Sequence, residues 1–254
     1  MTDRMLPDMI RQICHDHDIT YQSFSDDWAM RLEKNHVVKW IIGYTFDINT
    51  AASAYVANDK VACYQVLSDA KLPAIEHYLV RSRTANRFIV PQKELARVVA
   101  KPLAASSGIG VMPFDSVTEA RAYVMNQPTG DWALSPRYDI ARELRYFVLD
   151  SDILLAYEKT QPSDNHGLPM FNLSRGAIAT VIEPSTVLSR MACNATRAIG
   201  LRACAVDIAQ LHDGSYTIVE INQGFGLGRF AHQSQEHHAI TYVLYEKIID
   251  AMMQ

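Results

Sequence analysis

The sequence has few cysteines, no long apolar run and no excess of positive charge. Its four cysteines, Cys14, Cys63, Cys193 and Cys204, form no CxxC pair, which argues against a zinc site or a disulfide framework and favours a reducing cytoplasm. No apolar run approaches the roughly 18 residues of a membrane span, and the N-terminal residues lack the apolar core of a signal peptide. A net charge of −4 gives no general attraction to nucleic acid or membranes. We therefore expect a cytoplasmic protein with no membrane partner, whose function resides in a specific site.

The composition is that of an ordinary globular protein, with 48% hydrophobic and 20% charged residues in a chain of 254, enough for one large or two modest domains. Hydrophobic periodicity predicts alternating strands and helices along the chain. In the first half these are a helix over 5–16, a strand over 20–24, a polar helix over 26–35, a buried strand over 37–44, a helix over 49–70, strands over 77–80 and 87–90, a helix over 91–98, two strands around a small-residue loop within 98–114, and a helix over 116–127.

Antiparallel strands dominate the second half of the sequence. The expected elements are strands over 132–140, 143–160 with a turn at 150–152, and 176–184, a helix over 185–200, a hairpin over 203–222, and a last helix over 236–253. The apolar stripe of this last helix is typical of packing against a core.

The hairpin over 203–222 brings polar side chains into a run of β-branched residues. With its turn at 213–214, Asp207 and Glu220 lie opposite each other, and Asn222 shares the face of Glu220 because side chains alternate along a strand. Two adjacent carboxylates repel each other unless a cation lies between them. Magnesium prefers such oxygen ligands; pairing with nearby arginines or lysines on a solvated sheet is the alternative.

A second candidate site is the segment KPLAASSGIGV, where Lys101 ends a strand and a loop of small residues follows. Backbone N–H groups at Ser106, Ser107, Gly108 and Gly110 are suited to wrapping a polyphosphate. The segment is not a P-loop, because its lysine precedes the glycines. An ordinary hairpin loop is the alternative interpretation.

Four motifs in order, KPLAASSGIGV, ELRYFV, NLSRG and AVDIAQLHDGSYTIVEIN, resemble the ATP-grasp superfamily, most closely its RimK-like amino acid and peptide ligases. The resemblance covers residues 58–222. It implies an α+β fold in which two α+β lobes clasp ATP. The expected domains are an abbreviated N-terminal α/β domain over 1–50, a small lobe with the Gly/Ser loop over 51–130, and a large lobe with the metal site over 131–254.

The resemblance also implies roles for individual residues. Those expected to bind ATP are Lys60, Lys101, Ser106, Ser107, Gly108, Gly110, Arg137, Tyr138, Glu143 and Asn172. Arg145 and Arg175 are expected to face the transferred groups as catalytic residues, and Lys159 is a weaker candidate there. Asp207, Glu220 and Asn222 match the ligands of Mg²⁺, for which Mn²⁺ is an alternative.

Three segments depart from the family pattern or remain ambiguous. The hinge has Ser135, Pro136 and Arg137 where the family carries a Gln-Glu pair, so the adenine contacts are not defined by the resemblance. Residues 224–238 contain glycines, Arg229 and several histidines, which either shape the acceptor pocket or cap the last helix. The basic stretch 81–101 is expected to be a solvated face and not a nucleic-acid site, because no aromatic platform accompanies it. Its Arg81, Arg83 and Arg87 are alternative contacts for an acidic substrate.

The resemblance therefore predicts an ADP-forming carboxylate-amine ligase that works through an acyl phosphate. Its substrates would be an amino acid, peptide or related small molecule with a carboxylate, together with an amine acceptor; a homo-oligomer is compatible with this. A kinase acting on a hydroxyl and a non-catalytic nucleotide-binding module are the alternatives.

Overall fold

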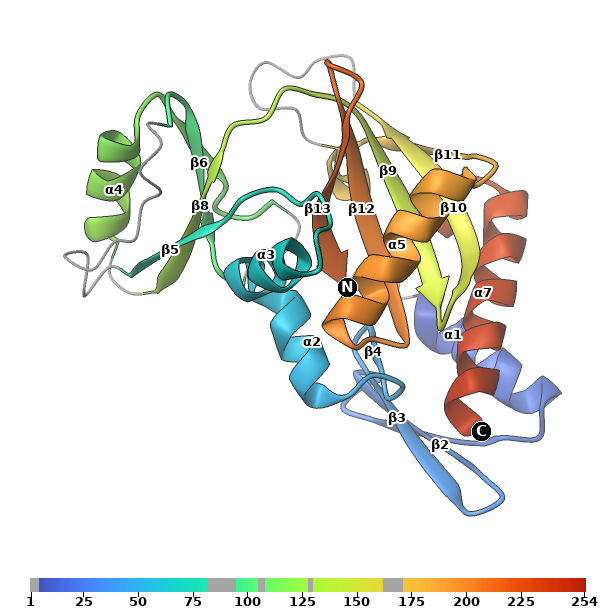
Figure 1. The fold of residues 1–254 in the computed structure, drawn as a ribbon. Coiled ribbons are helices and arrows are strands. Elements are labelled where there is room, and N and C mark those ends of the chain that lie inside the picture. The colour runs from blue at the N-terminus through green and yellow to red at the C-terminus, as the bar shows by residue number, and fades with distance from the viewer. Residues whose placement is uncertain (1–4, 82–94, 105–107, 128–129, 162–170) are drawn as a thin grey trace.

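The computed structural model describes residues 5–81, 95–104, 108–127, 130–161 and 171–254 (Figure 1). Its described part contains three antiparallel sheets with helices packed on them. Figure 1 shows a smaller lobe around α4 standing apart from a larger body, with the chain crossing between them after β8. This mixed α+β architecture agrees with the expected fold class.

The small lobe is a four-stranded sheet in the order β5-β8-β6-β7, covered on one face by helix α4. Its elements are β5 (Tyr78–Arg81), β6 (Val98–Pro102), β7 (Met112–Phe114), α4 (Val117–Met125) and β8 (Asp131–Pro136). Alternate residues of β6, Val98 and Ala100, are buried against α4. Val99 and Lys101, which alternate with these two residues, point to the opposite face, which borders the pocket between the lobes.

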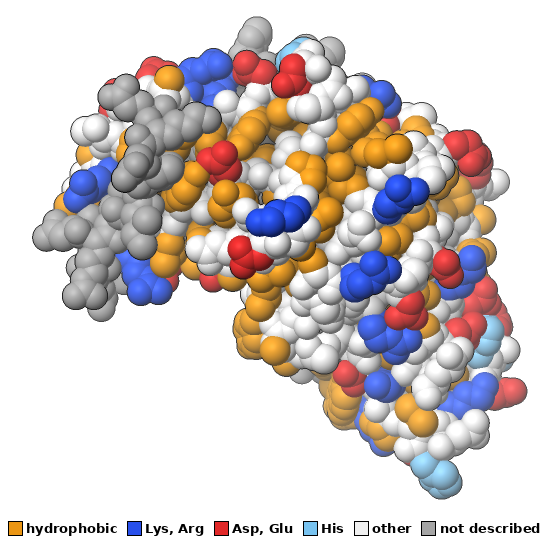
Figure 2. Space-filling model, in the orientation of Figure 1, with side chains coloured by type: hydrophobic (Ala, Val, Ile, Leu, Met, Phe, Trp, Pro, Cys, Tyr) orange, Lys and Arg blue, Asp and Glu red, His pale blue; other side chains and the backbone are white. Residues whose placement is uncertain are grey.

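The large lobe is a five-stranded sheet in the order β11-β10-β9-β12-β13. Its strands are β9 (Ile140–Leu149), β10 (Asp152–Thr160), β11 (Ile178–Val181), β12 (Ala203–Leu211) and β13 (Tyr216–Asn222). Helices α2 (Ala51–Asn58), α3 (Lys60–Asp69) and α5 (Thr186–Ile199) share a hydrophobic core with one face of the sheet. Figure 2 looks onto this side, where charged side chains of both signs are interspersed with hydrophobic ones.

The first segment of the chain forms α1 (Met5–Asp16) and a meander of β1 (Thr20–Phe24), β2 (Ala29–Lys34), β3 (Val37–Ile42) and β4 (Thr45–Phe46). One face of this sheet packs into a core that also contains residues of β9, β10, α6 (Gly228–Ala231) and α7 (Gln235–Met253). The segment therefore shares its core with the large lobe.

Two expectations for the N-terminal segment are wrong. Residues 29–34 form a strand and not a helix, because Met30 and Leu32 are both buried with the period of two that a strand requires. Strand β3 is buried on one face only. Ile41 is fully buried, whereas Trp40 and Ile42 retain 37% and 42% of their exposure. Together with Phe24 and Trp28, these two residues leave an apolar surface at one end of the sheet.

The elements that the sequence predicted elsewhere are mostly confirmed, including α1, the hairpins and a helix α5 ended by Gly200 with φ 79°. The helix expected over 49–70 is divided, because Asp59 accepts hydrogen bonds from Val61 and Ala62 N–H at 2.9 Å and caps a new helix. A helix over 91–98 is wrong in its described part, since residues 95–97 are not helical and Val98 begins β6. The strand predicted over 87–90 lies outside the described residues.

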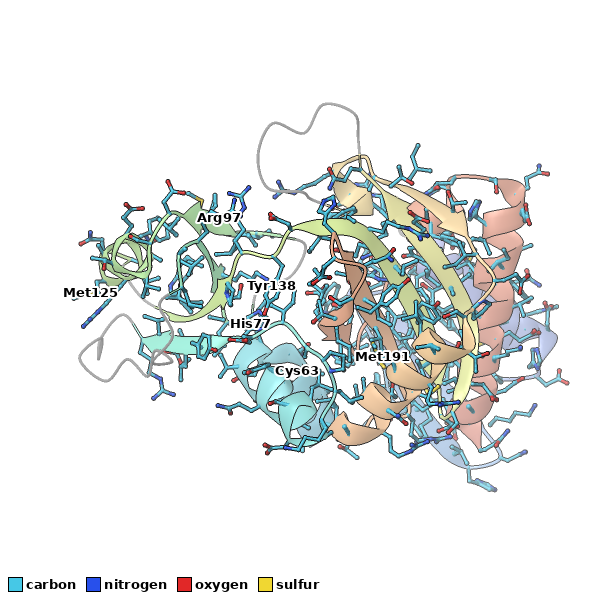
Figure 3. All side chains as sticks on the ribbon, turned by 45° about the horizontal axis from the view of Figure 1, so that its top comes forward. Cys63, His77, Arg97, Met125, Tyr138 and Met191 are labelled. Carbon is cyan, nitrogen blue, oxygen red and sulfur yellow. The ribbon has the colours of Figure 1, made fainter. Side chains whose placement is uncertain are left out.

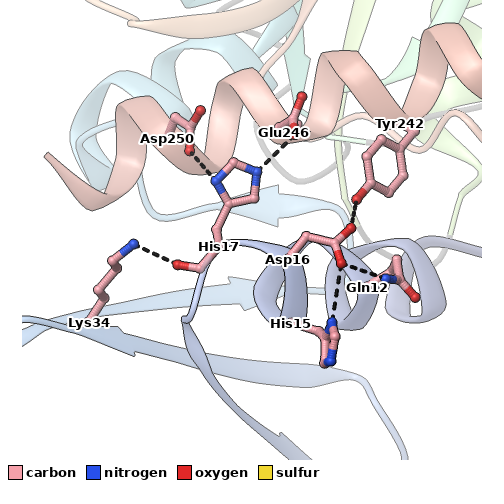
Figure 4. A network of polar contacts seen from close by, with 8 residues as sticks. All are labelled: Gln12, His15, Asp16, His17, Lys34, Tyr242, Glu246 and Asp250. Carbon is pink, nitrogen blue, oxygen red and sulfur yellow. Dashed lines mark hydrogen bonds and ion pairs between the residues drawn. The ribbon is translucent and has the colours of Figure 1, made fainter.

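Helix α1 is joined to α7 by polar contacts as well as by the core (Figure 4). His17, just beyond α1, lies with Nε2 2.8 Å from Glu246 and Nδ1 3.6 Å from Asp250. Tyr242 donates to Asp16 at 2.7 Å. Among the described residues, no helix combines the length and apolar character needed to cross a membrane.

Candidate active site

A pocket of about 1210 Å³ lies between the two lobes and contains most of the predicted site residues. Figure 3 shows His77 and Tyr138 at the junction of the lobes, where the chain passes from β8 to β9. Six lysines or arginines and three acidic residues line the pocket. This excess of positive charge favours an anionic ligand.

The large-lobe wall of the pocket is a row of charged residues on adjacent strands. Arg145 on β9 pairs in register with Asp207 on β12, which pairs on its other side with Glu220 on β13. One step along the sheet, Lys159 on β10 lies opposite Glu143 on β9. These side chains share one face because side chains alternate along each strand. Further along the same face, Phe147, Leu155 and Ala205 enter the core beneath α7, so the charges begin where that cover ends.

Asp207 is the centre of this network. Arg145 donates to both of its oxygens, from Nε at 2.6 Å and from Nη2 at 2.5 Å. The Lys159 ammonium lies 3.0 Å from Asp207 and 2.5 Å from Glu143. Asp207 is 1% and Lys159 3% exposed, so both charges are held away from water.

The pKa values in this network follow from burial and charge pairing. Burial alone would raise the pKa of Asp207, but the charges of Arg145 and Lys159 outweigh it and hold that pKa well below its usual range. Burial raises the pKa of Glu143, against the opposing charge of Lys159. Burial would lower the pKa of Lys159, yet Asp207 and Glu143 keep it above its ordinary value. Asp207, Lys159 and Arg145 are therefore held in their charged forms at neutral pH.

Asp207, Glu220 and Asn222 converge as the sequence predicted. The amide of Asn222 donates to Glu220 at 2.9 Å and to Asp207 at 3.5 Å. Asp207 and Glu220 pair directly, although a β-bulge shifts the register between Asp207 and Ile208. No group of three or more His, Cys, Asp or Glu among the described residues is arranged to hold a metal ion. The two carboxylates nevertheless fit Mg²⁺, a hard cation that accepts few protein oxygens, and Asn222 would join them if its amide turned its oxygen toward the ion.

Arg145, which we expected to face the transferred groups, lines the pocket and is bound to Asp207. The bond arises because the two residues are directly opposite on neighbouring strands. A cation at Asp207 would share that carboxylate with Arg145 and Lys159.

The small-lobe wall has a different character. We use this name for the side of the pocket formed by Lys101 on β6 together with Lys60, which begins α3 on the large lobe but reaches across to donate to the Leu103 carbonyl at 3.2 Å. Burial lowers the pKa of each lysine, and Glu220 opposes the shift in both. Each lysine is therefore placed where an added anion would stabilise its charge.

The glycine loop is described from Gly108 onward, and Ser106 and Ser107 lie outside the described residues. Gly108 and Gly110 have φ values of 70° and 72°, and Gly108 borders the pocket. A Cβ on Gly110 would come within 2.8 Å of the Pro102 ring, so this tight turn requires glycine. Arg175 is exposed and donates to the Gly108 carbonyl at 3.3 Å. It links the large lobe to the loop and does not line the pocket.

Arg137, Tyr138, Glu143 and Asn172, the other residues expected at the nucleotide, all line the pocket. The pKa of Tyr138 is raised, chiefly by burial. Two hinge positions offer no backbone donor to the pocket. Pro136 has no N–H, and the Arg137 N–H donates to the Arg97 carbonyl at 2.9 Å.

The segment after β13 forms the far end of the pocket and also begins the last helix, so both sequence interpretations apply. Gly224, Gly226, Gly228, Arg229 and His232 line the pocket. His237 accompanies the Ser234 cap at the start of α7.

Tyr44 of the N-terminal segment closes this end of the pocket. Its carbonyl accepts the Phe225 N–H at 3.0 Å. A Cβ on Gly226 would approach the Tyr44 ring to 2.7 Å, so the glycine permits this close packing.

Sequence reasoning missed His77 and Tyr44 and undervalued Lys159. For Lys159 the signal was present, since a lysine within an apolar strand needs a buried partner. His77 and Tyr44 had no motif around them, and only the tertiary structure brings them to the pocket.

The fold is that of the ATP-grasp ligases. The structure superimposes on that of the ATP-grasp ligase PsnB complexed with minimal precursor, Mg and ADP with a TM-score of 0.58 and 16% identity, over 82% of this chain and 62% of that one. D-alanine--D-alanine ligase from Bacillus anthracis complexed with ATP gives a TM-score of 0.57 and 16% identity, over 80% of this chain and 67% of that one. At such identities the similarity establishes the fold.

The chain belongs to the RimK-like ATP-grasp domain family, whose model matches residues 57–245. A probable alpha-L-glutamate ligase of Saccharophagus degradans is 28% identical over 193 residues, covering 72% of this chain and 61% of the relative. One from Shewanella loihica is 27% identical over 188 residues, with the same coverages of 72% and 61%. The chain thus spans about three fifths of the length of these curated relatives.

Proposed function

We propose that the protein is an ATP-dependent carboxylate-amine ligase that forms an acyl phosphate, releases ADP and joins the acyl group to an amine. The observation that carries the proposal is the paired row of Arg145, Asp207 and Lys159 facing Lys60 and Lys101 across one pocket. Membership of the RimK-like family supports it. The proposed substrates are amino acids or peptides, in keeping with the names of the relatives.

In this proposal Lys60 and Lys101 bind the phosphates, and the Gly108 turn lies over them. Asp207, Glu220 and Asn222 would hold Mg²⁺, which when bound neutralises charge on the phosphates and on the developing acyl phosphate. Arg145 and Lys159 fix the orientation of Asp207 and add positive charge beside it. Catalysis then rests on positioning and charge stabilisation, and no covalent nucleophile of the protein takes part.

The decisive experiment measures ADP release from Mg-ATP in the presence of amino acids and dipeptides, singly and in pairs, with mass spectrometry of the products. A ligase releases ADP only when a carboxylate and an amine are both supplied, and its product loses one water relative to the two substrates. A stable phosphorylated product formed without an amine would identify a kinase. Binding of ATP with no release of ADP over the whole panel would contradict the ligase proposal.

A variant at Glu220 tests the metal site separately. Glu220→Gln keeps the shape and the hydrogen-bond acceptor for Asn222 but removes a charge, so we expect turnover to fall about a hundredfold or more. The free energy of unfolding should change little, because Glu220 is only half-buried. Glu158→Gln is the matched control, since Glu158 lies on the same sheet and pairs with Arg142 outside the pocket. Undiminished turnover of Glu220→Gln would eliminate the proposed metal role.

A further inference from the structure

His77 is a buried histidine with one nitrogen left unpaired. It immediately precedes β5 and is 4% exposed, and it lines the pocket. Its Nε2 has no hydrogen-bond partner among the described residues. Leaving a buried polar atom unsatisfied costs about 1–3 kcal/mol, so such an atom in a pocket calls for a ligand that pairs with it.

The surroundings of the His77 ring determine whether its unpaired Nε2 is a hydrogen-bond donor or an acceptor. The backbone of Ile75 raises the pKa of His77, as a carbonyl close to the ring does. The N–H of Ile75 is donated to the Ile218 carbonyl at 2.9 Å, so the Ile75 carbonyl is the backbone group left to face the ring. Burial lowers the pKa of His77 well below its ordinary value, and Lys101 and Lys60 reinforce the shift. With the one proton of the neutral ring assigned to Nδ1, on the side of the Ile75 carbonyl, Nε2 presents a lone pair to the pocket.

The position of His77 in the small-lobe sheet indicates which part of a nucleotide lies beside it. Strand pairing places Val99 opposite Ser135, next to the hinge, and Lys101 opposite Ala133, one step nearer the Gly108 turn. His77 adjoins Tyr78, which pairs with Leu134, so it belongs to the end of the sheet nearer the hinge. Figure 3 shows it close to Tyr138. The base end of a nucleotide whose phosphates reach Lys101 and the turn would face His77.

We infer that His77 is a specificity-determining residue whose Nε2 accepts a hydrogen bond from the exocyclic amino group of adenine. The inference rests on the proposed function, because it assumes that the pocket binds ATP. The hinge supports it from the other side, since Pro136 and Arg137 have no free backbone N–H with which to read the base. Guanine carries an oxygen acceptor at the corresponding ring position, and two acceptors facing each other repel. His77 thus selects adenine over guanine.

Binding measurements with two nucleotides that differ only in the exocyclic amino group test the proposed hydrogen bond. Calorimetric titration with ATP and with purine riboside 5′-triphosphate, which lacks the amino group, is carried out in Mg²⁺ on the wild-type protein and on His77→Phe. The wild type should prefer ATP about fivefold to tenfold, the value of one neutral hydrogen bond. In His77→Phe the affinity for ATP should fall by that factor, and the affinity for the purine analogue should stay unchanged.

Two further variants separate recognition from a structural role. His77→Gln retains an acceptor at the tip of the side chain and should keep part of the preference for ATP. His238→Phe, on an exposed residue that does not line the pocket, should behave as the wild type. His77→Phe should also unfold at a temperature no lower than the wild type, because it removes an unsatisfied polar atom.

The outcomes distinguish this inference from the proposed function. If His77→Phe binds ATP but keeps the wild-type preference, His77 does not read the base and the inference is wrong. Equal loss of affinity for both nucleotides would place His77 at the sugar or phosphates, which also overturns it. If the wild-type protein binds no ATP, the proposed function fails and the inference fails with it.

Discussion

The two walls of the pocket hold their charges in opposite ways. On the large-lobe wall, burial is outweighed by pairing, so the pKa of Asp207 is lowered and that of Arg145 is raised well above its ordinary value. On the small-lobe wall, burial prevails, and the pKa values of Lys60, Lys101 and His77 are all lowered. On the large-lobe wall, Arg145, Lys159 and Asp207 find their ion-pair partners within the protein. The small-lobe wall gains stability from an anionic ligand, which suits a surface that binds and releases a nucleotide.

Breaking the large-lobe wall should have the largest effect on stability. Asp207→Ala leaves the half-buried Arg145 and the buried Lys159 without their shared carboxylate, and we expect the free energy of unfolding to fall by about 3–5 kcal/mol. Urea denaturation followed by circular dichroism measures the change. The exposed pair of Asp150 and Arg202 is the control, because its side chains retain 51% and 50% of their exposure. Asp150→Asn, which keeps a residue suited to the left-handed φ of 55° at this turn, should cost less than about 1 kcal/mol, and equal losses in the two variants would refute the proposed difference.

Breaking the small-lobe wall should instead affect ligand binding. Lys101→Met removes a half-buried charge that lacks an ion-pair partner among the described residues and whose pKa is lowered by burial, so the protein should lose no stability. Its affinity for ATP should fall about tenfold to a hundredfold, the value of a charge-assisted hydrogen bond. Titration calorimetry and thermal unfolding of the same sample give both quantities. If Lys101→Met unfolds much more easily and binds ATP normally, Lys101 stabilises the fold and does not bind the ligand.

Acid should weaken the large-lobe wall selectively. The pKa of Asp207 is lower in the folded than in the unfolded state, so its contribution is fully present above the unfolded value of about 3.9. It is lost as the pH falls from there through the folded pKa. We expect the difference in unfolding free energy between wild type and Asp207→Asn to be constant from pH 7 to 5 and to shrink below pH 4. A difference that does not depend on pH would show that Asp207 stabilises by shape alone.

The smallest expected effect is a change in the free energy of unfolding at alkaline pH, caused by Lys101 of the small-lobe wall. The pKa of Lys101 is lower in the folded state, so between that value and the unfolded value of about 10.4 the unfolded chain binds more protons. Stability therefore rises with pH in this window. Urea midpoints at pH 8 and pH 10 should show a small rise in the wild type that is reduced in Lys101→Met. Saturating Mg-ATP should also reduce it, and a rise unaffected by either would have another origin.

The sequence was sufficient for the part of the site that lies within one hairpin. Asp207 and Glu220 were placed opposite each other from the turn at 213–214, because local register follows from hairpin geometry. It was insufficient for contacts between distant strands. The bond from Arg145 to Asp207 joins residues 62 positions apart. Whether the Nε2 atom of His77 finds a hydrogen-bond partner is likewise decided by tertiary structure and not by the neighbouring residues in the sequence. Residues 26–35 were mistaken for a helix because a short polar strand has no apolar stripe to reveal its period.

The shared core of α1 and α7 has a consequence for the order of folding during synthesis. Leu6, Ile10 and Ile13 of α1 are synthesised long before Ile248 and Ile249 of α7, with which they share this core. Until α7 emerges, the early segment carries its apolar side chains without their cover, which favours association with chaperones or with other chains. Synthesis of α7 then completes this core, after the strands that carry Arg145 and Asp207 have been made.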